Sequence, residues 1–159
     1  MGLLKGRTEE YGSPLVGLPA RLYTGYFFLK YGLAKATGGF GGESLRETLA
    51  GWVADSTYPF YVPFLTRVAI PFADLFALSV IVGEIVVGAA ILAGFATRAA
   101  SIVGMVMCLN FAFATGAPLL STEEPVVFAV LLLTVYLTAA GRALGLDVFM
   151  KKLLPRWAA

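Results

Sequence analysis

Residues 99–122 contain no charged side chain, and this stretch most constrains what the chain can fold into. An apolar segment of about 20 residues is long enough to cross a bilayer as a helix. Hydrophobic residues make up 58% of the 159 residues and charged residues only 14%, whereas a soluble domain carries roughly 25% charged residues. We therefore expect an integral membrane protein rather than a soluble or disordered chain.

Charged residues and turn-forming residues divide the chain into four apolar segments. They predict an all-α, four-transmembrane-helix bundle in a single membrane domain, with spans over residues 14–33, 70–95, 99–115 and 124–140. Residues 35–66 are expected to form an external loop. Within this loop Leu45, Leu49 and Trp52 recur at helical spacing between charged residues, which predicts a short amphipathic helix on the membrane surface over residues 43–55.

The distribution of lysine and arginine predicts the orientation in the membrane. Seven of these residues lie in the two ends of the chain and in the turn after the second span: Lys5, Arg7, Arg98, Arg142, Lys151, Lys152 and Arg156. Three lie in the other two connections: Lys35, Arg46 and Arg67. Because cytosolic segments carry the excess of positive charge, we expect a multi-pass protein of the inner (plasma) membrane with both termini cytosolic. Residues 142–159 would form a basic cytosolic tail with a surface helix.

The counts of reactive residues limit the chemistry of the chain. It has no histidine and one cysteine, Cys108. Since His and Cys are the usual ligands of zinc and haem, we expect no metal and no cofactor held by metal ligation or by a covalent bond. A catalytic triad with histidine is also excluded, and no self-contained catalytic site is expected. A net charge of +2 predicts membrane lipids rather than nucleic acid as partners.

The first two expected spans contain four charged residues: Arg21, Lys30, Asp74 and Glu84. Lys30 and Asp74 are expected near the membrane surface, whereas Arg21 and Glu84 lie deeper. Charges inside a bilayer are costly and usually face the bundle interior. Gly17 and Gly25 share a helix face with Arg21, and Gly88 shares one with Glu84, so the two backbones can approach closely. We therefore expect an Arg21–Glu84 ion pair in the core. It serves either as a packing pair or as a polar site for a quinone head group or a proton.

The third span adds one more ligand candidate, Asn110, whose amide can hold a ligand carbonyl or bond a neighbouring helix. Small residues at four-residue spacing form another face of this span and predict a helix-packing seam: Ala100, Gly104, Cys108 and Ala112. Cys108 is therefore expected to be a packing residue of the core. Three tyrosines of the first span are expected to add stacking or hydrogen bonds to a ligand: Tyr23, Tyr26 and Tyr31.

Three short motifs together resemble the pattern of DoxX-like membrane proteins over residues 15–150. The first is Arg21-Leu-Tyr-Thr-Gly25, followed by Gly32 and Lys35. The second is Glu84-Ile-Val-Val-Gly88, followed by Gly94 and Arg98. The third consists of Gly141 and Gly145-Leu-Asp147. The long loop after the first span is similar to the DoxD-type branch, and the resemblance implies a four-helix membrane protein.

The resemblance also implies a connection with membrane redox complexes. Some DoxX-like proteins are the small membrane subunit of a thiosulfate:quinone oxidoreductase, and others are accessory parts of membrane redox or stress complexes. We therefore expect a membrane subunit of a larger redox or energy-converting complex, associated with quinone and with the other subunits of that complex. It would be at most one subunit of a quinone-linked oxidoreductase. The alternative is a non-catalytic scaffolding subunit, and a third reading is a transporter, which with four short spans would need to oligomerise.

Overall fold

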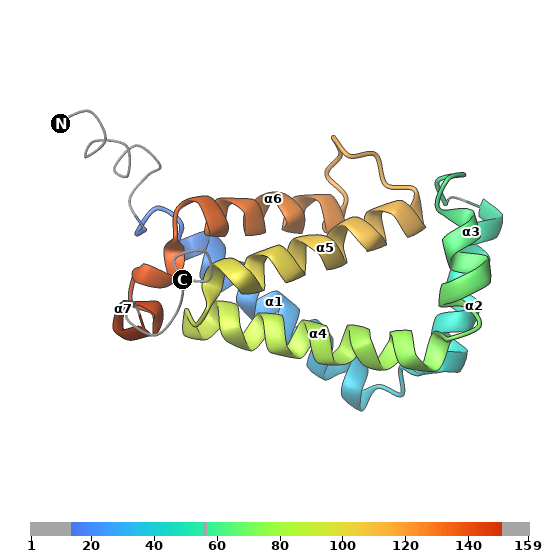
Figure 1. The fold of residues 1–159 in the computed structure, drawn as a ribbon, viewed down its shortest axis with the longest axis horizontal. Coiled ribbons are helices and arrows are strands. Elements are labelled where there is room, and N and C mark those ends of the chain that lie inside the picture. Colours follow the sequence, from blue (N-terminus) through green and yellow to red (C-terminus); the bar gives the residue numbers. More distant parts are fainter. Residues whose placement is uncertain (1–13, 56, 151–159) are drawn as a thin grey trace.

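The computed structural model describes residues 14–55 and 57–150, and every regular element in them is a helix. Four longer helices run along the long axis of the molecule: α1 (Leu18–Thr37), α4 (Ala73–Ala93), α5 (Thr97–Thr115) and α6 (Glu124–Leu137) (Figure 1). Across one end lie α2 (Gly42–Asp55), α3 (Val62–Phe64) and the π-helical turn η1 (Leu65–Ala69). At the other end lie the 3-10 turn η2 (Ala140–Arg142) and α7 (Asp147–Met150). The expectation of an all-helical fold is confirmed.

Within the described residues, two helices are long and apolar enough to cross a membrane, α4 and α5. They fall on the expected second and third spans. α6 is a shorter apolar helix of 14 residues. α1 continues to Thr37, beyond the expected end of the first span, so Lys35 lies in the last turn of this helix and not in the loop. Of the tail expected over residues 142–159, the structure describes the part up to Met150, which contains the short helix α7. The remainder of this tail and the expected cytosolic segment before residue 14 lie outside the described residues.

Glycines in the left-handed region end two of the long helices. The backbone of Gly94 (φ 65°) closes α4, and its N–H donates to the carbonyls of Ala90 and Ile91. Gly116 (φ 72°) closes α5 in the same way. Side chains with a Cβ rarely adopt this conformation, which makes glycine the usual residue here. The short turn at Gly94 joins α4 and α5 at one end, and the two helices diverge toward the end where α2 and α3 lie (Figure 1).

α1 packs antiparallel against α4 through glycines. A Cβ built on Gly25 would lie 2.8 Å from the backbone nitrogen of Leu92. A Cβ on Gly32 would lie 2.8 Å from the backbone nitrogen of Ile85, and one on Gly88 would meet the backbone of α1. Only glycine lets two helices approach this closely. The three contacts agree on a single alignment of α1 along α4. This alignment determines which side chains of the two helices lie at the same level of the bundle.

α2 covers the end of the bundle with its apolar face. Leu45 and Leu49 are buried there against residues of η1, α4 and α5. Beside this apolar face, the guanidinium of Arg46 donates to Glu43 over 2.7 Å and lies 3.8 Å from the carboxylate of Asp74 in α4. Apolar burial and surface charge thus hold α2 across the opening between α4 and α5.

Candidate functional site

Arg21 lies at the end of the bundle where the Gly94 turn is, and not beside Glu84. It is 2% exposed, and its Nη1 donates to the carbonyl oxygens of Ala140 (2.8 Å) and Ala143 (2.7 Å). The predicted Arg21–Glu84 ion pair is therefore wrong. The reason is the register of α1 on α4: Arg21 lies next to Gly94, which is about 15 Å further along the helix axis than Glu84.

Asp147, which is fully buried, completes this end of the bundle. Its Oδ1 accepts from the N–H of Ala96 (2.7 Å) and its Oδ2 from the N–H of Thr97 (3.1 Å). The carboxylate thereby satisfies amides at the N-terminus of α5, where the helix dipole favours a negative charge. Its charge also attracts Arg21. The Arg21–Asp147 cluster joins α1, α5 and the segment after α6, and these contacts give Arg21 a structural role.

Glu84 pairs with Lys35 instead of Arg21. The Nζ of Lys35 donates to both carboxylate oxygens, over 2.6 Å to Oε1 and 2.7 Å to Oε2. Glu84 is only 6% exposed. The same ammonium lies 5.7 Å from the ring centroid of Tyr31 and 5.9 Å from that of Phe40, within the range of cation–π attraction. The pair is part-buried, because 27% of the Lys35 side chain is exposed. A charge held between apolar helices is costly to desolvate and often marks a polar site.

The Lys35–Glu84 pair lines a cavity of about 320 Å³, which we call the Glu84 cavity. The cavity lies between α1, α4, α5 and α6 and beneath α2. Six aromatic side chains line it: Phe28, Tyr31, Phe40, Trp52, Phe111 and Phe128. Tyr31 donates to the exposed carboxylate of Glu124 over 3.2 Å. The cavity therefore combines an apolar aromatic wall with one ammonium and two carboxylates.

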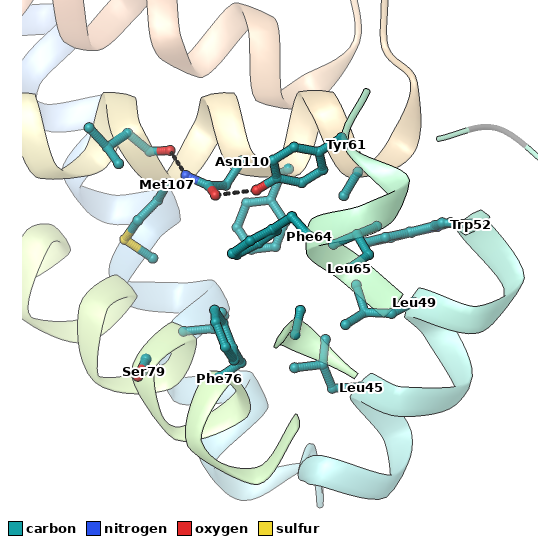
Figure 2. Close-up of a pocket in the computed structure, with 15 residues that line it drawn as sticks. Leu45, Leu49, Trp52, Tyr61, Phe64, Leu65, Phe76, Ser79, Met107 and Asn110 are labelled. Carbon is teal, nitrogen blue, oxygen red and sulfur yellow. Dashed lines mark hydrogen bonds between the residues drawn. The ribbon is translucent and has the colours of Figure 1, made fainter. Parts of the chain in front are cut away.

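Asn110 lies on another face of α5 and lines a second cavity of about 240 Å³, the Tyr61 cavity (Figure 2). The hydroxyl of Tyr61 donates to Oδ1 of Asn110, and Nδ2 of Asn110 donates to the carbonyl of Val106 over 2.7 Å. Burial raises the pKa of Tyr61, so its hydroxyl stays protonated at neutral pH. Apart from this pair and Ser79, the wall of the Tyr61 cavity is apolar.

The structure places the predicted packing residues at helix contacts. A Cβ on Gly17 would meet the side chain of Thr138, and one on Gly104 would lie 2.8 Å from Leu132. Ala100 packs against the main core cluster. Cys108 and Ala112 are buried, and Cys108 also lines the Glu84 cavity. Gly25 and Gly88 lie in the α1–α4 contact described above.

The three predicted ligand residues thus lie in three places: Arg21 in the end cluster, Glu84 in one cavity and Asn110 in the other. Sequence reasoning missed their direct partners, Lys35 and Tyr61. The position of Lys35 in the first DoxX-like motif was a sequence signal that could have marked it as a candidate site residue. No sequence pattern indicated that Tyr61 would contact α5. Within residues 14–55 and 57–150, no group of three or more His, Cys, Asp and Glu residues is placed to hold a metal ion.

Comparison with known proteins identifies one family. The DoxX family profile matches residues 16–117, which run from just before α1 to just beyond α5 and include Lys35, Glu84 and Asn110. No curated protein and no solved structure matches the chain. Because the profile covers well over half of the sequence, the chain belongs to the DoxX family of membrane proteins, the family that its sequence motifs resemble.

Proposed function

We propose that this chain is a membrane subunit of a larger redox or energy-converting complex and that it binds a quinone head group in the Glu84 cavity. The observation that carries the proposal is the part-buried Lys35–Glu84 pair in a mostly aromatic and apolar wall. Membership of the DoxX family supports the membrane setting. The cavity volume of about 320 Å³ lies at the lower end of the range for small-molecule sites.

The residues present fit a quinone. An ammonium has three N–H donors and Lys35 uses two of them on Glu84, so one remains for a ligand carbonyl. The Glu84 carboxylate has further lone pairs that can accept a ligand O–H. Aromatic rings such as Phe111 and Phe128 can pack on an apolar ring. A bound quinone would supply two-electron redox chemistry, while Lys35 and Glu84 would orient its oxygens and hold a proton beside them.

The alternative function is that of a non-catalytic scaffold in a membrane assembly. It is favoured by the fact that Lys35 and Glu84 satisfy each other, as the two members of a purely structural pair would. In the first function a quinone forms hydrogen bonds with Lys35 and Glu84. In the second these two residues bond only each other.

Quinone binding distinguishes the two functions. The complex should be purified in mild detergent with its co-purifying subunits and titrated with a benzoquinone that lacks an isoprenoid tail. Replacing both charged groups, in Lys35→Met/Glu84→Gln, should weaken binding about ten-fold or more, since a hydrogen bond to a charged group contributes about 1.5–3 kcal/mol. Lys30→Met, which removes an exposed cation from the same helix, should leave binding unchanged. Equal binding by the double variant, or no binding by the unsubstituted protein, would favour the scaffold.

We further propose that α1, α4, α5 and α6 all cross the inner membrane, that both termini are cytosolic and that α2 lies on the external side. The excess of lysine and arginine in the ends and in the α4–α5 turn supports this orientation. The location of α2 at the end of the bundle opposite α7 agrees with it (Figure 1).

Cysteine labelling tests this orientation. In a Cys108→Ala background, Gly41→Cys should react with a membrane-impermeant maleimide from the external side. A Cβ at Gly41 meets no atom within 4 Å, so the substitution is expected to be tolerated. Phe149→Cys, on the exposed surface of α7, should react only after the membrane is opened. The reverse pattern would show that the protein has the opposite orientation.

A further inference from the structure

We propose that the Tyr61 cavity is the lateral route by which a quinone passes from the lipid to the Glu84 cavity, and that it holds the first part of the isoprenoid tail. This inference rests on the function proposed above. The two cavities share three lining side chains: Leu45, Trp52 and Phe111. The two cavities are therefore neighbours, and these three side chains separate them.

The two cavities are lined by different sets of helices. The Glu84 cavity is lined by residues of α1, α2, α4, α5 and α6 and has the exposed Glu124 at its edge, whereas the Tyr61 cavity is lined by residues of α2, α3, η1, α4 and α5. α4 and α5 diverge toward the end of the bundle where α2 and α3 lie (Figure 1). Figure 2 shows Leu45, Leu49 and Trp52 pointing from α2 into this opening. The side chains of α2 thus fill a gap that would otherwise lead between α4 and α5 into the bundle.

The far edge of the Tyr61 cavity reaches the surface of α4 and α5. Ser79, Val106 and Asn110 line the cavity and are all exposed, Val106 by 54%. This surface belongs to the two helices that are long and apolar enough to cross a membrane. An opening here would face lipid, where a quinone with a long tail is dissolved.

The wall of the Tyr61 cavity suits an uncharged hydrocarbon chain. No charged residue lines it. Its main polar groups satisfy one another, because Tyr61 donates to Asn110 and Asn110 donates to Val106. An apolar chain can lie against these groups without breaking either hydrogen bond. The Glu84 cavity, by contrast, holds Lys35, Glu84 and Glu124 and suits the polar oxygens of the head group.

Trp52 supplies a probe for the test because it lines both cavities. The sequence has two tryptophans, and Trp157→Phe leaves Trp52 as the fluorescent one. In this background, quenching of Trp52 should be followed after mixing the reconstituted protein with vesicles that contain a quinone with a long isoprenoid tail. A tail-less, water-soluble benzoquinone added from the aqueous side serves as the comparison.

Ser79→Phe narrows the proposed route, and Leu78→Phe is its matched control because Leu78 is 58% exposed on α4 and does not line the cavity. Ser79→Phe should slow quenching by the tailed quinone about ten-fold or more and leave quenching by the tail-less quinone unchanged. Leu78→Phe should change neither. Val106→Phe blocks the route from the α5 side and provides a second variant if Ser79→Phe does not fold.

The outcomes separate this inference from the proposed function. If Trp52 is quenched by both quinones at the unsubstituted protein's rate in Ser79→Phe and Val106→Phe, the lateral route is overturned. The proposal of a head-group site in the Glu84 cavity would not be affected by this result. Equal slowing with both quinones would also overturn it, because the substitutions would then have disturbed the head-group site. If neither quinone quenches Trp52 in the protein with native Ser79 and Val106, the proposed function itself fails.

Discussion

Lys35→Met is expected to lower the free energy of unfolding clearly, because it leaves the carboxylate of Glu84 buried without its partner. Removing one member of a fully buried ion pair typically costs about 3–5 kcal/mol. This is an upper limit for Lys35, because 27% of its side chain is exposed, but it is still a sizeable part of the roughly 5–15 kcal/mol that stabilises a protein. The bond at issue is short and bidentate, over 2.6 and 2.7 Å, and Glu84 is 6% exposed. The measurement is the unfolding midpoint of the purified protein in detergent.

The double variant Lys35→Met/Glu84→Gln should recover most of this stability. Replacing a buried ion pair by neutral groups of similar volume is often neutral or stabilising, since it removes the desolvation penalty of both charges. Lys30→Met controls for the loss of a lysine from α1, because Lys30 is exposed and is expected to change the midpoint little. A Lys35→Met protein as stable as Lys30→Met would contradict the structural importance of the pair.

Arg21→Gln is the second substitution with a large expected effect. The guanidinium donates to two buried carbonyls, those of Ala140 and Ala143, and a hydrogen bond to a charged group contributes about 1.5–3 kcal/mol. The loss of both bonds should reduce the free energy of unfolding by about 3–6 kcal/mol, measured as for Lys35→Met. Arg46→Gln removes a half-exposed arginine of α2 that pairs with Glu43 and should cost less than about 1 kcal/mol.

The same assay tests whether Arg21 and Glu84 are independent. Sites with no shared partner and more than about 7–10 Å apart give nearly additive effects. The losses from Arg21→Gln and Glu84→Gln should therefore add in the double variant. A double variant more stable than Glu84→Gln alone would indicate a direct Arg21–Glu84 pair and would contradict the observed register.

The amino-acid sequence by itself determined the helical character, the membrane setting and the family of this protein. The uncharged stretch from residue 99 to residue 122 and the low charge content admit few folds other than apolar helices. Periodicity also indicated the face that each helix buries, which is why Leu45 and Leu49 of α2 were expected on one side. These properties are local, since each depends on residues within a few helical turns.

Only the tertiary structure decided which charges meet. Periodicity places Arg21 and Glu84 on inward faces, but it says nothing about how far one helix is shifted along the other. That shift comes from the fit of Gly25, Gly32 and Gly88 into the α1–α4 contact. It brings Lys35 to Glu84 and leaves Arg21 for carbonyls after α6, which lie more than 100 positions away in the sequence. Both cavities are lined by residues of several helices, so they depend on helix packing that no single segment encodes.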